Sequence, residues 1–166
     1  MEQTLQPKWE GKVSRRLTQA TADQIWTLFK DFFNLHKWFP SLDTSYGVHG
    51  TNGEPGCIRY SAGFSIRSAD DGNRHFSWSK ERLTAVDHEQ RSLSYEIVDS
   101  NIGFESYVST VKIVPGDHHD GQHGCLIEWS FTVDPVEGME FDELVKKYDV
   151  GLQRMAKQME ESLLQA

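Results

Sequence analysis

The sequence predicts an α+β fold in which a curved antiparallel sheet wraps around one long C-terminal helix. The helix is predicted because apolar residues recur in steps of three and four over residues 141–164. They are Phe141, Leu144, Val145, Tyr148, Leu152, Met155, Met159 and Leu163. At 1.5 Å per residue such a helix is roughly 36 Å long. Its apolar stripe needs an apolar surface of equal length, which the strand-rich middle of the chain supplies as a sheet.

Seven segments carry strand patterns. The first alternates cleanly, with Trp9, Val13 and Leu17 on one side and polar residues on the other. Turn residues such as Asn52-Gly53, and those at 70–73, 87–90 and 115–124, separate the later segments. The predicted strands are residues 8–17, 42–49, 56–62, 74–86, 92–98, 103–114 and 125–133.

A pair of short helices is predicted between the first two strands. Thr21 and Gln24 fit a capping box, helical spacing continues to Phe33, and Asn34 is expected to cap a further turn that Pro40 ends. This order of elements predicts a helix-grip arrangement. The short helices would close one end of a gap between sheet and long helix, and a ligand would occupy that internal cavity. We expect residues 1–7 to be disordered and residues 8–166 to form one domain.

The composition excludes several classes of partner. The 166 residues suffice for a core and a cavity, and the net charge of −8 without a basic run argues against nucleic-acid or anionic-membrane binding. A small-molecule ligand or a protein partner is favoured. No apolar leader or run of about 18 apolar residues is present, so we expect a cytoplasmic protein without membrane insertion. Cys57 and Cys125 lie in apolar runs, which predicts buried, reduced thiols.

Arg59 and Glu81 are the candidate reactive pair. They lie on neighbouring predicted strands, and at ~4 Å with an effective dielectric constant near 20 they would attract by about 4 kcal/mol. A guanidinium can hold an anionic oxygen while a carboxylate moves a proton. Spacing alone favours a salt bridge on the outer face, because Phe76 and Trp78 are expected inward, opposite to Glu81. A mixed cavity wall or a β-bulge would still place Glu81 inside.

Other polar candidates have plainer interpretations. Tyr107 shares a face with Val111 and Ile113, so it is expected to point inward, where a satisfied core hydroxyl is commoner than a catalyst. The histidines within residues 117–123 lie among Gly and Asp, which favours a solvated hairpin loop over a metal site. His36 is interpreted as a core or rim histidine. We expect no metal and no cofactor.

Several motifs in order resemble one family. They are QIWTLFKDFFNLHKWFPSL, GCIRY, WSKERLTAVDHEQRSLSYEIV and GFESY. This series resembles the plant lachrymatory-factor-synthase-like proteins of the polyketide cyclase/dehydrase, START/Bet v 1-like superfamily. The similarity extends from Lys8 to the C-terminus, and it implies the helix-grip fold with a large internal cavity.

The resemblance also implies a cofactor-independent isomerase. In the synthase, the arginine and glutamate that match Arg59 and Glu81 are taken as catalytic, and a tyrosine that matches Tyr107 lines the site. The resemblance therefore implies Arg59, Glu81 and Tyr107 as the catalytic residues of this chain. A small alkenyl sulfenic acid becomes a thial S-oxide when a proton moves from oxygen to carbon. Arg59 would bind the sulfenate oxygen, Glu81 would relay the proton and Tyr107 would orient the substrate. The expected ligand-binding residues are Trp38, Phe39, Phe64, Trp78, Phe104, Trp129 and Tyr148.

A binding protein is the alternative class, because a carrier of apolar plant metabolites or lipids needs only the cavity. Abscisic-acid receptors look similar around Glu81 and Tyr107. The chain lacks their S-G-L-P-A gate, with SAGFS at 61–65, and it lacks their H-R-L latch, with IGF at 102–104. Their ligand-carboxylate lysine falls near Ser41. These departures argue against hormone sensing, and they leave enzyme and carrier open.

Overall fold

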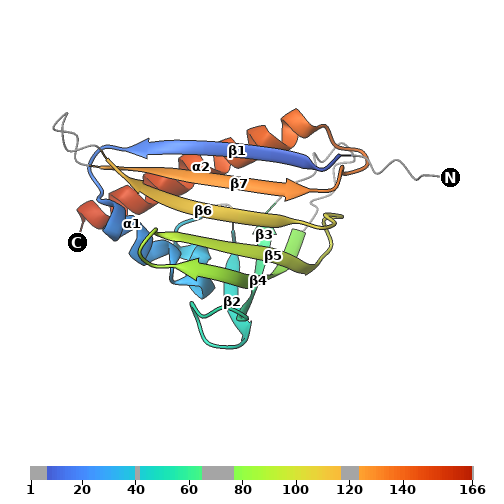
Figure 1. Cartoon of the computed structure of the whole chain (residues 1–166), viewed down its shortest axis with the longest axis horizontal. Helices are drawn as coiled ribbons and strands as arrows, with labels where there is room; N and C mark the ends of the chain where they lie inside the picture. Colours follow the sequence, from blue (N-terminus) through green and yellow to red (C-terminus); the bar gives the residue numbers. More distant parts are fainter. Residues whose placement is uncertain (1–6, 40–41, 65–76, 117–123, 166) are drawn as a thin grey trace.

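The computed structural model describes residues 7–39, 42–64, 77–116 and 124–165. It confirms the predicted class, with one seven-stranded antiparallel sheet of strand order β1-β7-β6-β5-β4-β3-β2 and a long helix behind it (Figure 1). The elements are β1 (Trp9–Leu17), α1 (Ala22–Phe29), the 3-10 helix η1 (Phe32–Lys37), β2 (Thr44–His49), β3 (Ile58–Phe64), β4 (Ser77–Asp87), β5 (Ser92–Ser100), β6 (Val108–Pro115), β7 (Cys125–Val133) and α2 (Phe141–Leu164).

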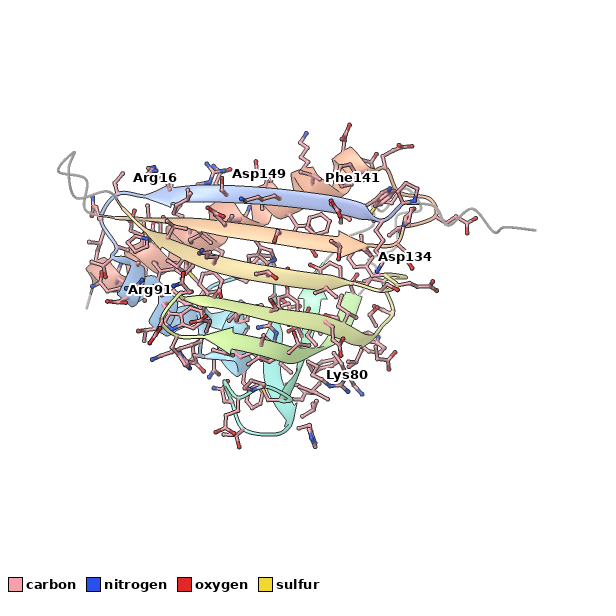
Figure 2. The ribbon with its side chains drawn as sticks, in the orientation of Figure 1. Arg16, Lys80, Arg91, Asp134, Phe141 and Asp149 are labelled. Carbon is pink, nitrogen blue, oxygen red and sulfur yellow. The ribbon has the colours of Figure 1, made fainter. Side chains whose placement is uncertain are left out.

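Helix α2 has the predicted bounds and lies along one face of the sheet (Figure 1). Its buried residues are Leu144, Leu152, Met155, Ala156 and Met159. Full burial of a large apolar side chain is worth about 1.5–3 kcal/mol, so this stripe is a main source of stability. Figure 2 shows Phe141 at the start of the helix, where its ring centroid lies 5.7 Å from that of Trp9 on β1.

The first helical region is split into two helices. The predicted capping box is present: Thr21 Oγ1 accepts from Gln24 N at 3.1 Å, and Gln24 Oε1 accepts from Thr21 N at 2.9 Å. Helix α1 nevertheless ends at Phe29 rather than continuing to Phe33. Asn34 does not cap a new helix but forms a kink inside η1, with φ −111° and ψ 30°. Its side chain donates to Asp31 Oδ1 at 2.7 Å, and such local hydrogen bonds compete with regular helix.

Helix α1 closes one end of the space between sheet and α2. The Glu160 carboxylate of α2 accepts from the backbone N–H groups of Gln19 and Ala20, each at 3.1 Å. On the other side, Arg91 Nε donates to Asp23 Oδ1 of α1 at 2.7 Å, and Figure 2 shows Arg91 next to this helix. These contacts fix α1 where the sequence predicted an end plug.

The strands agree with the predicted ranges except for a few shifted ends. Strand β7 has its predicted bounds, and every odd residue from Cys125 to Val133 is buried. The strand expected from Gly103 begins only at Val108, because Gly103 (φ 79°) and Ser106 (φ 56°) have left-handed backbone conformations. Cys57 and Cys125 are buried free thiols, as predicted. The turn expected at 70–73 and the histidine loop at 117–123 lie outside the described residues, as does nearly all of the N-terminus expected to be disordered.

Gly11 makes room for an aromatic ring of the core. It pairs with Phe131 in the β1–β7 ladder, and a Cβ at Gly11 would lie 2.4 Å from Phe131 Cζ. Phe131 is itself buried, with its ring centroid 4.5 Å from that of Tyr148, so the ring has little room to move. We expect Gly11→Ala to lower the free energy of unfolding by about 1–3 kcal/mol in urea titrations. Ser14→Ala, at an exposed position of β1, should change it by less than about 0.5 kcal/mol. Equal stability of the two variants would contradict this account.

Candidate functional site

A cavity of about 730 Å³ lies between the inner face of the sheet, α2 and the segment that follows η1. This volume falls in the range of about 300–1,000 Å³ that is usual for small-molecule sites. Most of the wall is apolar, including Leu35, Phe39, Leu42, Leu144 and Met155. Two charged side chains of the sheet, Arg59 and Glu81, also line it. The cavity therefore combines an apolar volume with a polar centre on the sheet.

The polar centre is a buried ion pair on two adjacent strands. Arg59 of β3 and Glu81 of β4 face each other in the ladder, and Arg59 Nε donates to Glu81 Oε1 at 2.7 Å. The residues are only 3% and 8% exposed. The expectation from spacing, an ion pair on the outer face, is therefore wrong. The inner face of β4 carries Ser77, Ser79, Glu81 and Leu83, all buried.

Neighbouring groups hold both halves of this pair. Arg59 Nη1 donates to the backbone oxygen of Phe32 at 3.0 Å, and the guanidinium carbon lies 3.8 Å from the Phe32 ring centroid and 4.9 Å from that of Tyr95. Ser79 Oγ donates to Glu81 Oε2 at 3.1 Å. A desolvated cation over an aromatic ring gains up to about 2 kcal/mol. Phe32 of η1 thus supplies both a carbonyl oxygen and an aromatic ring that stabilise Arg59. No pattern in the sequence indicated this role for Phe32.

Tyr107 lies behind the cavity wall. It precedes β6, is buried, and its ring is stacked with those of Phe104, Phe131 and Tyr148 at centroid distances of 5.6, 6.1 and 6.4 Å. Its hydroxyl forms a short hydrogen bond with the Tyr148 hydroxyl of α2. Among the described residues that line the cavity, Tyr148 is present and Tyr107 is not. Tyr107 points inward, as predicted, and it reaches the cavity through Tyr148.

Tyr95 is a wall residue that the sequence reasoning missed. It is 4% exposed, and its ring lies 6.1 Å from Phe32 and 6.4 Å from Trp129. The alternation of Leu93, Tyr95 and Ile97 along the predicted strand was the signal that could have placed it on the inner face.

Burial changes the acidity of the three inner tyrosines. It raises the pKa of Tyr95, Tyr107 and Tyr148 well above the ordinary value of 10.0, because a phenolate would lose its hydration. The negative charge of the Glu81 carboxylate raises the three pKa values further, because it would repel a phenolate. Hydrogen bonds from the Ser109 hydroxyl to Tyr95 and Tyr107, and from Tyr107 to Tyr148, oppose this rise without cancelling it. These hydroxyls therefore remain neutral hydrogen-bonding groups at physiological pH.

The remaining aromatic candidates divide into two groups. Phe39, Trp129 and Tyr148 line the cavity. Trp38, Trp78 and Phe104 are not among the described residues of its wall. Trp78 is on the outer face, where its ring stacks on Tyr60 at 6.1 Å, which corrects the inward placement. Phe104 packs behind Tyr107, and Trp38 is partly buried against the hydrophobic core. The side chain of Phe64 is outside the described residues.

The described residues offer no cluster of three His, Cys, Asp or Glu side chains that could hold a metal ion. Within the same residues, none of the helices combines the length and apolar character needed to cross a bilayer.

The chemistry that this site can perform with its own residues is recognition of a polar group and movement of a proton.

Comparison with known families agrees with this architecture. The family described as "Polyketide cyclase / dehydrase and lipid transport" matches residues 8–160. The chain belongs to this family. The match spans every element from β1 to most of α2, so the polyketide cyclase/dehydrase family assignment covers the whole cavity wall described above.

The chain is similar to several known proteins at low sequence identity. MLP-like protein 423 of Arabidopsis thaliana is 28% identical over 116 residues, which are 68% of each chain. The crystal structure of ginseng major latex-like protein 151 from Panax ginseng has a TM-score of 0.70 at 19% identity, covering 93% of this chain and 97% of that one. Protein XoxI from Bacillus cereus has a TM-score of 0.68 at 23% identity, covering 93% and 95%. These structures establish the helix-grip, Bet v 1-like fold.

Proposed function

We propose that the protein binds a small, largely apolar molecule in this cavity and that Arg59 and Glu81 move a proton on it. The observation that carries the proposal is the buried ion pair, which is part of an otherwise mainly apolar wall. Burial of two charges is costly, and a hydrophobic pair of similar volume is often as stable. A role in ligand recognition or catalysis therefore explains a charged pair that faces a cavity better than a contribution to stability alone does.

The reaction that fits best is the isomerisation of a small alkenyl sulfenic acid to a thial S-oxide. The Arg59 guanidinium would hold the sulfenate oxygen, and the Glu81 carboxylate would accept the O–H proton and return it to the alkenyl carbon. The S–O group keeps its oxygen, one O–H bond breaks and one C–H bond forms, so no cofactor is needed. Tyr148 and Tyr95 line the same cavity and would position the substrate.

A coupled assay tests this proposal. Alliinase and its alkenyl cysteine sulfoxide generate the sulfenic acid, and thial S-oxide is measured with and without the protein. We expect product that depends on the protein, with a loss of at least about 100-fold for Arg59→Ala and for Glu81→Gln. Variants that fold and retain full activity would disprove the assignment of this pair.

Binding without catalysis is the second candidate, and the mainly apolar wall is the observation that favours it. The family description also includes lipid transport. A folded protein that yields no thial S-oxide but takes up an apolar fluorescent probe into the cavity would support the carrier function over the isomerase.

A further inference from the structure

The mouth of the cavity has a charge that differs from the rest of the molecule. On α2, Leu144, Tyr148 and Met155 face inward, and the residues that precede them, Glu143, Lys147 and Arg154, also line the cavity. A shift of one position turns a side chain by about 100° around a helix, so these three lie on one flank of α2. Glu143 and Arg154 are exposed to solvent while also lining the cavity, so this flank lies at its mouth.

Among the described residues, cations predominate at this opening. Lys146, Lys147 and Arg154 line it against the one lining carboxylate of the helix, Glu143, while the whole chain carries a net charge of −8. Asp43 is a second acidic group nearby, since a Cβ at Gly63 of the wall would lie 2.6 Å from Asp43 Cγ. Burial lowers the pKa of the Lys147 ammonium, and Glu143 opposes that shift. The mouth remains the basic part of the cavity.

The interior does not favour an additional anion. Arg59 is already paired with Glu81, so their charges cancel inside the cavity. A ligand carboxylate placed there would be a buried charge in excess, which is strongly unfavourable without a partner of its own. The apolar wall, in contrast, favours a hydrocarbon chain.

We propose that the mouth is a second subsite, which binds the carboxylate of an amphipathic acid whose hydrocarbon chain fills the cavity. Lys146, Lys147 and Arg154 hold the head group at the surface, while the chain extends toward Tyr95 and Trp129. This inference rests on the binding part of the proposed function and is independent of the isomerase reaction.

Competition with a neutral probe tests the subsite. N-phenyl-1-naphthylamine fluorescence reports occupation of the cavity, and decanoate and 1-decanol compete for it at pH 7.5 and low salt. Because the two competitors share one chain, their difference reports the head group. We expect decanoate to displace the probe at a concentration roughly 3- to 30-fold lower than 1-decanol. This preference should shrink in 1 M NaCl, where the Debye length is about 3 Å.

A matched pair of triple variants separates local from overall charge. K146Q/K147Q/R154Q should lose most of the preference for decanoate and bind 1-decanol as before. K12Q/K80Q/K112Q lowers the net charge equally, but on the outer face of the sheet, where Figure 2 labels Lys80. This variant should keep the preference, and thermal unfolding checks that both fold.

The outcomes distinguish this inference from the function on which it rests. Equal displacement by decanoate and 1-decanol, or a preference that survives K146Q/K147Q/R154Q, would overturn the subsite while leaving cavity binding in place. If neither decanoate nor 1-decanol displaces the bound probe, the subsite proposal is also overturned. Failure of the probe itself to bind the folded protein would instead remove the proposed binding function.

Discussion

Glu81→Ala is expected to lower the free energy of unfolding by about 3–5 kcal/mol, because removal of one partner leaves a buried charge without compensation. Arg59 would keep the Phe32 carbonyl and the two aromatic rings, but its Nε would lose the carboxylate 2.7 Å away. Urea unfolding at pH 7.5 measures the effect. Glu96→Ala is the matched control, since Glu96 pairs with Arg82 at 2.8 Å with both side chains more than a third exposed. That loss should stay below about 1 kcal/mol.

A double variant separates stability from chemistry. R59M/E81L replaces both charges with apolar side chains of similar size, and such replacements are often neutral in stability. We expect it to recover most of the stability that Glu81→Ala loses, yet to yield no thial S-oxide in the coupled assay. Equal, small losses for Glu81→Ala and Glu96→Ala would show that water compensates the Arg59–Glu81 pair in solution. The proposal that Arg59 and Glu81 form a desolvated reactive pair would then be wrong.

The elements with the strongest periodicity could be predicted to the residue. Helix α2 and strand β7 have the predicted bounds, because each buries one face along its entire length.

The segment before β6 could not be predicted. Ser106 has φ 56°, and for a serine this conformation is set by the surrounding packing rather than by residue type. The irregular turn it makes is what presents Tyr107 to Tyr148.

The orientation of β4 was the main failure of pattern reasoning. A tryptophan is expected inside and a glutamate outside, but the structure has Trp78 outside and Glu81 inside. On the outer face, Trp78 is stacked on Tyr60, and Tyr60 packs against Tyr46 at 5.1 Å, so these rings cover one another. Inside, Arg59 from the adjacent strand compensates Glu81. Both exceptions depend on cross-strand neighbours that a single strand does not reveal.

Alkaline pH is expected to destabilise the protein through its three inner tyrosines. Below pH 10 their hydroxyls are protonated in the folded and unfolded states, so their contribution to stability is fully present. Above pH 10 the unfolded chain releases these protons, while Tyr95, Tyr107 and Tyr148 retain them because their folded pKa values are raised. The folded state then binds more protons, so stability falls by about 1.4 kcal/mol per pH unit for each tyrosine. The decline continues until the pH reaches the folded pKa values.

Urea unfolding between pH 9 and 11.5 measures this slope, and comparison between variants removes the contribution of groups that titrate in all of them. Tyr148→Phe should reduce the tyrosine contribution to the slope by about a third, whatever its effect on stability at pH 7. Tyr46→Phe removes a hydroxyl at a tyrosine that is 51% exposed, and it is the matched control for the substitution itself. An unchanged slope in Tyr148→Phe would mean that this hydroxyl is hydrated through the cavity. The shielding of the Tyr107–Tyr148 hydrogen bond from water, and with it the role of Tyr107 behind the wall, would then have to be abandoned.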